Sequence, residues 1–159
     1  MLSQVSSGLM MYCLDDKKIK IFLVHPGGPF FQNKDNGYWG VPKGLIEGNE
    51  KLLDTAKREF NEETGVTAPG GEDKYLSLGS IIQKSGKKVH CWAFKINKLS
   101  PINLTCNTFD LEWPPKSKKI QKFPEVDKGE FFTVDEAKVK INSSQMEFID
   151  RLLRILEKN

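Results

Sequence analysis

The sequence contains little cysteine and little histidine. Its 159 residues include three cysteines and two histidines, and the cysteines stand far apart at Cys13, Cys91 and Cys106. No Cys-x-x-Cys pair or Cys/His cluster occurs, which argues against a structural zinc site. An odd number of scattered cysteines gives no disulfide framework and is typical of a reducing compartment.

Long apolar runs are also missing. No run approaches the roughly 18 residues of a membrane span, and residues 1–16 lack the basic start and cleavage site of a signal peptide. The formal net charge of +3 is mild, so it permits an anionic substrate without requiring nucleic acid. We therefore expect a cytoplasmic protein with no membrane partner and no nucleic-acid partner. The sequence indicates no oligomeric state.

The predicted elements describe one domain over residues 1–159, without an internal repeat. Their order gives an α/β (α+β) fold, with a mixed β-sheet covered by helices on both sides. The second arm of a central hairpin is apolar on both faces, which indicates a strand inside the sheet. In the first two-thirds of the chain we predict antiparallel strands at 7–14 and 19–24, a loop at 25–37, a helix at about 50–63 and the hairpin at 75–84 and 87–96.

Residues 97–124 have the weakest pattern. A short strand is predicted at 109–113, and four lysines lie within 116–122. We interpret the lysine run as a solvated linker; the alternative is an electrostatic lip for polyphosphate or RNA. A strand at 130–134 and a short helix from Asp135 are followed by a final helix at about 144–157, capped by Ser143 or Ser144. Its predicted apolar face consists of Met146, Ile149, Leu152, Leu153 and Leu156.

Three glutamates share one face of the predicted helix at 50–63. Glu59, Glu62 and Glu63 stand at i, i+3 and i+4, within an arc of roughly 100°. Like charges at this spacing destabilise a helix by about 0.2–0.5 kcal/mol per pair, and the last helical turn favours cations. A positive partner is therefore expected. Hard divalent cations such as Mg²⁺ take carboxylate oxygens together with substrate phosphates.

The spacing around these glutamates is specific. Gly44 is followed by Glu50, Arg58-Glu59, an apolar Phe60, Glu62-Glu63, Gly65 and an apolar Val66. The run 44–66 resembles the Nudix box of the Nudix hydrolases, and all nine specified positions match. A chance match is on the order of 10⁻¹⁰ per window. The resemblance implies a Nudix fold, an α/β/α sandwich, and a pyrophosphohydrolase that cleaves a nucleoside diphosphate linked to another moiety.

The resemblance also implies residue roles. Glu59, Glu62, Glu63 and the Gly44 carbonyl would bind Mg²⁺ or Mn²⁺, and Glu62 or Glu63 would activate the attacking water. Arg58 would support catalysis by positioning a box glutamate, and Glu50 would be structural. Members of the family often use one more carboxylate from a downstream loop. The candidates here are Asp110, Glu112, Glu125 and Asp127, and we favour Glu125 as the further catalytic residue.

Residues before the box indicate the substrate. Trp39 to Gly44 resembles the W-x-x-P-K-G of the diadenosine tetraphosphate hydrolase branch. We therefore expect a dinucleoside polyphosphate to be cleaved, for example diadenosine tetraphosphate to ATP and AMP, with Lys43, Tyr38 and Phe31 binding the substrate. The alternatives are ADP-ribose, nucleotide sugars or (deoxy)nucleoside triphosphates as substrates, an RNA 5′-end pyrophosphohydrolase, and a non-catalytic nucleotide sensor.

Overall fold

The computed structural model describes residues 4–100 and 102–158. The single domain predicted over residues 1–159 therefore includes a few residues that lie outside the described part. In the described residues six strands form one sheet in the order β4-β5-β1-β2-β8, with β3 pairing to β1. The sheet strands are β1 (Val5–Asp15), β2 (Lys18–Pro26), β3 (Lys43–Leu45), β4 (Tyr75–Ile82), β5 (Lys88–Ile96) and β8 (Val126–Thr133).

The sheet is mixed, as predicted. β1 runs antiparallel to β2 and parallel to β5, and β4 and β5 form the predicted antiparallel hairpin. β5 lies between β4 and β1, which confirms that it is an internal strand. β8 begins at Val126, four residues earlier than predicted, because the chain joins the edge of β2 directly after Glu125.

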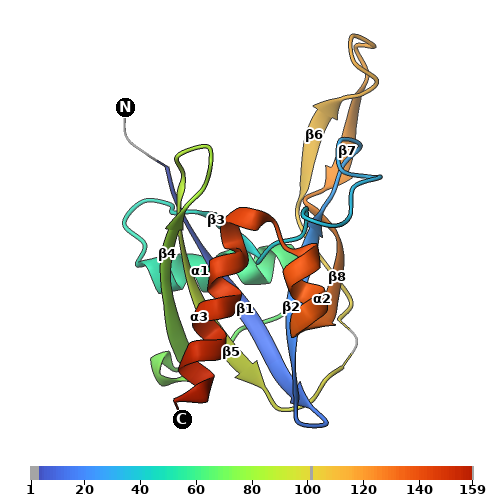
Figure 1. The fold of residues 1–159 in the computed structure, drawn as a ribbon. Helices are drawn as coiled ribbons and strands as arrows, with labels where there is room; N and C mark the ends of the chain where they lie inside the picture. Colours follow the sequence, from blue (N-terminus) through green and yellow to red (C-terminus); the bar gives the residue numbers. More distant parts are fainter. Residues whose placement is uncertain (1–3, 101, 159) are drawn as a thin grey trace.

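Helices cover both faces of the sheet (Figure 1). α1 (Leu52–Thr64) packs its buried Ala56 and Phe60 against one face. α2 (Val134–Lys140) and α3 (Met146–Glu157) lie on the other face. Gly65 ends α1 with φ 78° and donates its N–H to the Asn61 carbonyl at 2.7 Å, as expected for a left-handed glycine at a helix C-terminus. No helix among the described residues is both long and apolar enough to span a membrane.

The start of the final helix differs from the prediction. Neither Ser143 nor Ser144 caps α3; both lie in a 3-10 turn (Ser143–Gln145) that precedes it. The side chain of Asn142 accepts a hydrogen bond from the Gln145 N–H at 3.2 Å and begins this turn. The apolar face itself is confirmed: Ile149 and Leu152 are fully buried, and the other three predicted residues pack against the same core. Phe148, which the helical pattern missed, is also buried.

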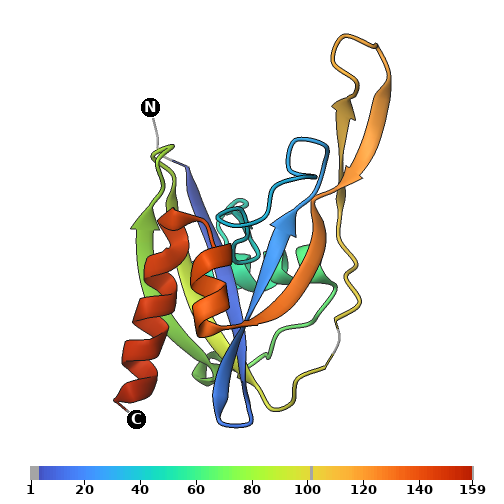
Figure 2. The same cartoon turned by 45° about the vertical axis from the view of Figure 1, so that its right-hand side comes forward.

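The lysine run is not a linker. β6 (Thr108–Glu112) confirms the predicted short strand, but it pairs with β7 (Ile120–Pro124), which takes up the second half of the run. The two strands form a hairpin that stands out from the body of the protein (Figures 1 and 2). Both faces of β7 are largely exposed. β7 therefore has no buried face, and the alternation of buried apolar and exposed polar residues that normally indicates a strand is absent from it.

Candidate active site

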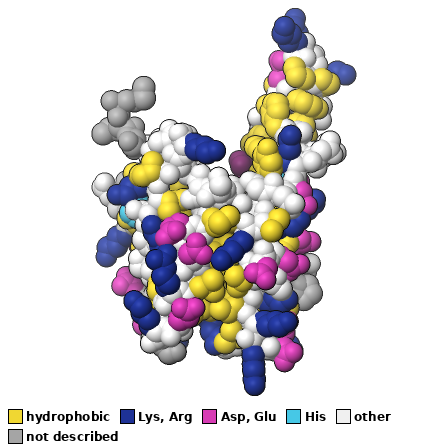
Figure 3. All heavy atoms as spheres, viewed as in Figure 1, with side chains coloured by type: hydrophobic (Ala, Val, Ile, Leu, Met, Phe, Trp, Pro, Cys, Tyr) yellow, Lys and Arg dark blue, Asp and Glu magenta, His cyan; other side chains and the backbone are white. Residues whose placement is uncertain are grey.

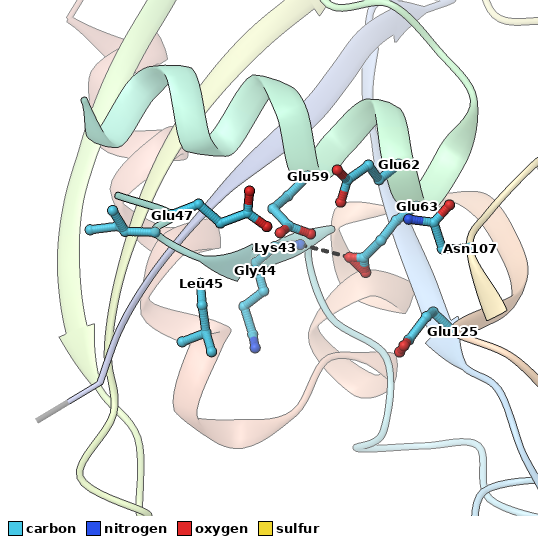
Figure 4. Close-up of a pocket in the computed structure, with 10 residues that line it drawn as sticks. Lys43, Gly44, Leu45, Glu47, Glu59, Glu62, Glu63, Asn107 and Glu125 are labelled. Carbon is cyan, nitrogen blue, oxygen red and sulfur yellow. Dashed lines mark hydrogen bonds between the residues drawn. The ribbon is translucent and has the colours of Figure 1, made fainter. Parts of the chain in front are cut away.

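A cavity of about 570 Å³ lies beside the last turns of α1. Figure 4 shows the glutamates of α1 facing β3 across it, with Glu125 on a third side. Five carboxylates and one lysine line the cavity, so a polyphosphate would be repelled from it in the absence of cations. The lining residues are Lys43, Gly44, Leu45, Ile46, Glu47, Glu59, Glu62, Glu63, Asn107 and Glu125.

Arg58 organises the carboxylates of α1. Its Nε and Nη2 donate to the two oxygens of Glu50 at 2.8 and 3.0 Å. Its Nη1 donates to Glu59 at 2.8 Å and to both oxygens of Glu62 at 3.2 Å. The Leu45 carbonyl accepts a further bond from Nη2 at 3.0 Å, which ties the box loop to the helix. One planar guanidinium thus fixes three carboxylates and the backbone of β3.

These bonds shift the pKa values of Glu50 and Arg58. The guanidinium of Arg58 lowers the pKa of Glu50 to about 2, and a hydrogen bond from the Glu47 N–H adds to the effect. The Arg58 pKa is raised in turn, chiefly by Glu50. Glu50 is therefore ionised at any physiological pH and has a structural place at the start of α1. This position agrees with the role that the resemblance implies for it.

Glu63 lies deeper than its neighbours and faces the sheet. Its Oε2 accepts a hydrogen bond from the backbone N–H of Lys43 at 3.0 Å. Burial nevertheless raises the pKa of Glu63 to about 8, because a carboxylate away from water loses solvation. Burial likewise raises the pKa of Glu59 and lowers that of Lys43. In the protein without a bound cation, burial therefore disfavours the charged forms of Glu59, Glu63 and Lys43.

The residues present fit a hard divalent cation. They offer carboxylate and backbone oxygens, the ligands that Mg²⁺ and Mn²⁺ prefer. Among the described residues no three acidic, histidine or cysteine side chains already surround a common point. Instead, Nη1 of Arg58 bonds to both Glu59 and Glu62. Binding a cation would therefore require these carboxylates to exchange part of their contact with Arg58 for contact with the metal.

Gly44 and Glu59 are in close contact across the cavity wall. A Cβ atom built on Gly44 would lie 2.0 Å from Glu59 Cδ, so no larger residue fits without moving the carboxylate. The Gly44→Ala variant is expected to lose at least tenfold in kcat, because displacing an expected metal ligand, Glu59, by about 1 Å is costly. Steady-state kinetics would test this. Gly70→Ala is the matched control, since its Cβ meets nothing within 4 Å and its activity should be unchanged.

Among the four downstream carboxylates, Glu125 is the one that faces this cavity. Asp110 pairs with Lys122 at 3.0 Å and Glu112 accepts from the Lys116 N–H at 2.8 Å, both on the projecting hairpin. Asp127 contacts the buried His25 at 2.7 Å.

The backbone of Glu125 is held on both sides. Its N–H donates to the Asn107 carbonyl at 2.9 Å, and its carbonyl accepts from the Gly27 N–H at 3.0 Å. The position of Glu125 is therefore fixed by neighbours that are distant in sequence.

A second cavity of about 320 Å³ adjoins the first and shares Lys43, Glu63 and Glu125 with it. Its wall combines apolar side chains with Tyr38, which is 43% exposed. The predicted substrate residues Lys43 and Tyr38 thus line the cleft. Phe31 lines neither cavity, but its ring centroid lies 6.2 Å from that of Tyr38.

Four asparagine or glutamine residues of the cleft were not predicted from the sequence. Asn107 lines the first cavity, and Gln83, Asn142 and Gln145 line the second. The Gln145 Oε1 accepts from the Val41 N–H at 2.9 Å, so its amide orientation is fixed within the wall. Single polar residues in segments far from the box carry no local pattern, and none of the four belongs to a motif. The tertiary fold alone brings them to the site.

Comparisons with known proteins identify the family and the fold. The NUDIX domain family matches residues 6–152 of the chain. No curated protein matches the sequence. An Ap4A hydrolase of C. elegans, in a binary complex, has a similar structure, with a TM-score of 0.69 and 19% identity over 98% of this chain and 99% of that one.

Other solved structures share the fold. The NUDIX domain of Shewanella oneidensis NrtR, complexed with ADP ribose, gives a TM-score of 0.67 and 17% identity over 98% of this chain and 90% of that one. A MutT protein of Methanosarcina mazei Go1 gives 0.62 and 16% over 98% and 96%. At these identities the likeness shows a common fold.

Proposed function

The chain belongs to the NUDIX domain family and is a pyrophosphatase hydrolase of the Nudix type, and on that premise we propose that it is a Mg²⁺-dependent hydrolase of dinucleoside polyphosphates. The favoured reaction is diadenosine tetraphosphate and water to ATP and AMP. The observation that carries the proposal is the lining of the first cavity. Five carboxylates with one lysine form a place for cations and phosphates, and a second cavity opens from it.

In this proposal Glu59, Glu62, Glu63 and the Gly44 carbonyl hold the divalent cation. Such a cation would neutralise phosphate charge and lower the pKa of water. Glu63 or Glu62 then orients the attacking water and accepts its proton. Arg58 keeps Glu59 and Glu62 in place through its bonds of 2.8 and 3.2 Å. The ammonium of Lys43 would contact the phosphates, which is consistent with its place in both cavities.

The second cavity is suited to one nucleoside of the substrate. Tyr38 presents an exposed ring at its mouth, and Gln145 has its amide oxygen engaged with Val41, leaving its NH₂ group available as a donor. Aromatic rings stack on nucleobases and amides hydrogen-bond to their edges. The Trp39–Gly44 lead-in favours a long polyphosphate, because Lys43 stands where the chain of phosphates would pass from one cavity to the other.

Glu125 is proposed to act as the additional carboxylate, in metal binding or as general base. The Glu125→Gln variant should lower kcat by more than tenfold, since a positioned acid or base contributes about 10²–10⁴-fold. Asp110→Asn is the matched control, because Asp110 lies on the projecting hairpin with Lys122. Full activity of Glu125→Gln, measured under saturating substrate, would rule out the role.

A substrate panel tests the proposed function. Diadenosine tetraphosphate, ADP-ribose, a nucleotide sugar, nucleoside triphosphates and a 5′-triphosphate RNA are each incubated with Mg²⁺, and the products are identified by chromatography. We expect the dinucleoside tetraphosphate to have the highest kcat/KM. If ADP-ribose or a nucleoside triphosphate reacts a hundredfold faster, the substrate assignment is wrong. If nucleotides bind without any turnover, the protein is a sensor.

A further inference from the structure

The β6–β7 hairpin has no part in the proposed hydrolysis. We call residues 108–124 the arm. In the described part of the chain its two strands pair only with each other, and both views show it projecting from the body (Figures 1 and 2). An isolated two-stranded hairpin is at best marginally stable in water. A projecting ribbon of this kind is therefore suited to binding a partner along its length.

Aromatic side chains lie along the arm. Trp113 packs edge-on against Phe30 of the neighbouring loop, with ring centroids 5.3 Å apart, and Phe109 faces Phe123 at 6.0 Å. Phe30 remains 61% exposed and Ile120 65% exposed. Figure 3 shows hydrophobic side chains over much of the arm. Exposed aromatic faces are the groups on which the bases of single-stranded nucleic acids stack.

Positive charge is concentrated at the end of the arm, where dark blue side chains gather in Figure 3. The arm contains four lysines and two acidic residues, a net charge of +2. Lys122 is paired with Asp110 at 3.0 Å. The ammonium groups of Lys116, Lys118 and Lys119 make no ion pair with any described residue and are exposed. Three cations are thus free to bind a polyanion.

The base of the arm adjoins the active-site cavity. Asn107 precedes β6 and Glu125 follows β7, and both line the cavity. The Glu125 N–H donates to the Asn107 carbonyl at 2.9 Å, which closes the base of the hairpin. A chain bound along the arm would therefore lead toward the carboxylates of α1.

We propose that the arm binds single-stranded nucleic acid, with bases stacked on Phe30 and Trp113 and phosphates held by Lys116, Lys118 and Lys119. Lysines interleaved with exposed aromatic rings are the usual means of binding single strands without sequence preference. This proposal rests on the local charge of the arm, and it differs from the expectation drawn from net charge alone, which was that no nucleic acid would be bound. This interaction goes beyond the proposed function, because it requires no hydrolysis.

Fluorescence anisotropy with a labelled 12-nucleotide RNA tests the proposal. The RNA carries a 5′-hydroxyl, so it has no phosphoanhydride for the active site to cleave. In K116Q/K118Q/K119Q the affinity should fall at least tenfold at low salt. The slope of log K against log salt should become shallower by about 2, since each lysine–phosphate contact on a single strand contributes about 0.7. Phe30→Ala should weaken binding about fivefold or more and leave the slope unchanged.

The matched control is K17Q/K18Q/K95Q, which removes the same charge from exposed lysines outside the arm, in the β1–β2 turn, in β2 and in β5. Its affinity should stay within twofold of the wild type. The proposal is overturned if the arm variant binds RNA like the wild type, or if the control loses as much affinity as the arm variant. Binding of phosphatidylserine vesicles through the same lysines, without RNA binding, would also overturn it and assign the arm to a membrane surface.

Discussion

Replacing Glu63 with Gln is expected to lower kcat by about 1,000-fold. The substitution keeps the shape of the side chain and its acceptor for the Lys43 N–H at 3.0 Å, but removes the charge and the basic oxygen. A general base contributes about 10²–10⁴-fold, and a lost metal ligand adds to this. Steady-state hydrolysis of diadenosine tetraphosphate with Mg²⁺ would measure the effect. Glu72→Gln, on an exposed 3-10 turn outside both cavities, is the matched control and should have wild-type kcat.

The Tm of Glu63→Gln shows whether its low activity comes from a missing catalytic group or from unfolding. Burial raises the pKa of Glu63 to about 8 in the metal-free protein, well above the ordinary value of 4.5. A raised folded-state pKa means that stability is retained at low pH and lost as pH rises from 4.5 through 8. In EDTA, Glu63→Gln should therefore have a higher Tm than the wild type at pH 8, by roughly 4 °C or more, and this advantage should shrink toward pH 5. A variant that melts earlier than the wild type at pH 8 would show that its low activity reflects unfolding.

Replacing Arg58 with Met should reduce both activity and stability. Methionine fills a similar volume but cannot bond to Glu50, Glu59, Glu62 or the Leu45 carbonyl. Residues that orient metal ligands typically affect activity by about 10–100-fold, and we expect the upper end here because two proposed ligands depend on one guanidinium. The carboxylates of Glu50, Glu59 and Glu62 would also lose their partner, so the Tm of the variant should be lower than that of the wild type.

The pH dependence of this variant identifies the interaction. Arg58 lowers the pKa of Glu50 to about 2, so Glu50 adds stability above its ordinary pKa of 4.5 and loses it as pH falls toward 2. The Tm difference between wild type and Arg58→Met should therefore narrow between pH 7 and pH 3. Arg154→Met is the matched control, since Arg154 is exposed and pairs only with Glu147 at 2.7 Å among side chains of the described chain. A Tm difference that stays constant with pH would assign the effect to packing instead.

The cluster of carboxylates in the site was predictable because its residues lie within one short stretch of sequence, residues 44–66. Glu59, Glu62 and Glu63 share a helix face by spacing alone, and Gly65 ends the helix where a left-handed residue is needed. The mixed sheet and the helices on both faces followed from the order of apolar patterns. These features depend on interactions between residues close in sequence, which local periodicity reports well.

The remainder depends on contacts between distant segments. Gln145 reaches Val41 across 104 positions, and Asn107 bonds to Glu125 only because β6 and β7 close a hairpin. β7 itself was missed because its residues are largely exposed on both faces, so no buried apolar period marks it as a strand. Asn142 replaced the predicted serine cap because a 3-10 turn precedes α3. In each case the tertiary structure overrides a weak local signal.

The most direct test of the central claim is the hydrolysis of diadenosine tetraphosphate in ¹⁸O-water, with Mg²⁺ or with EDTA, followed by mass spectrometry of the products. The central claim is that the α1 carboxylates use a divalent cation to direct water onto a phosphoanhydride. We predict ATP and AMP in equal amounts, with ¹⁸O in a phosphoryl group, and loss of turnover in EDTA. Turnover that persists in EDTA, or products without the label, would contradict the account.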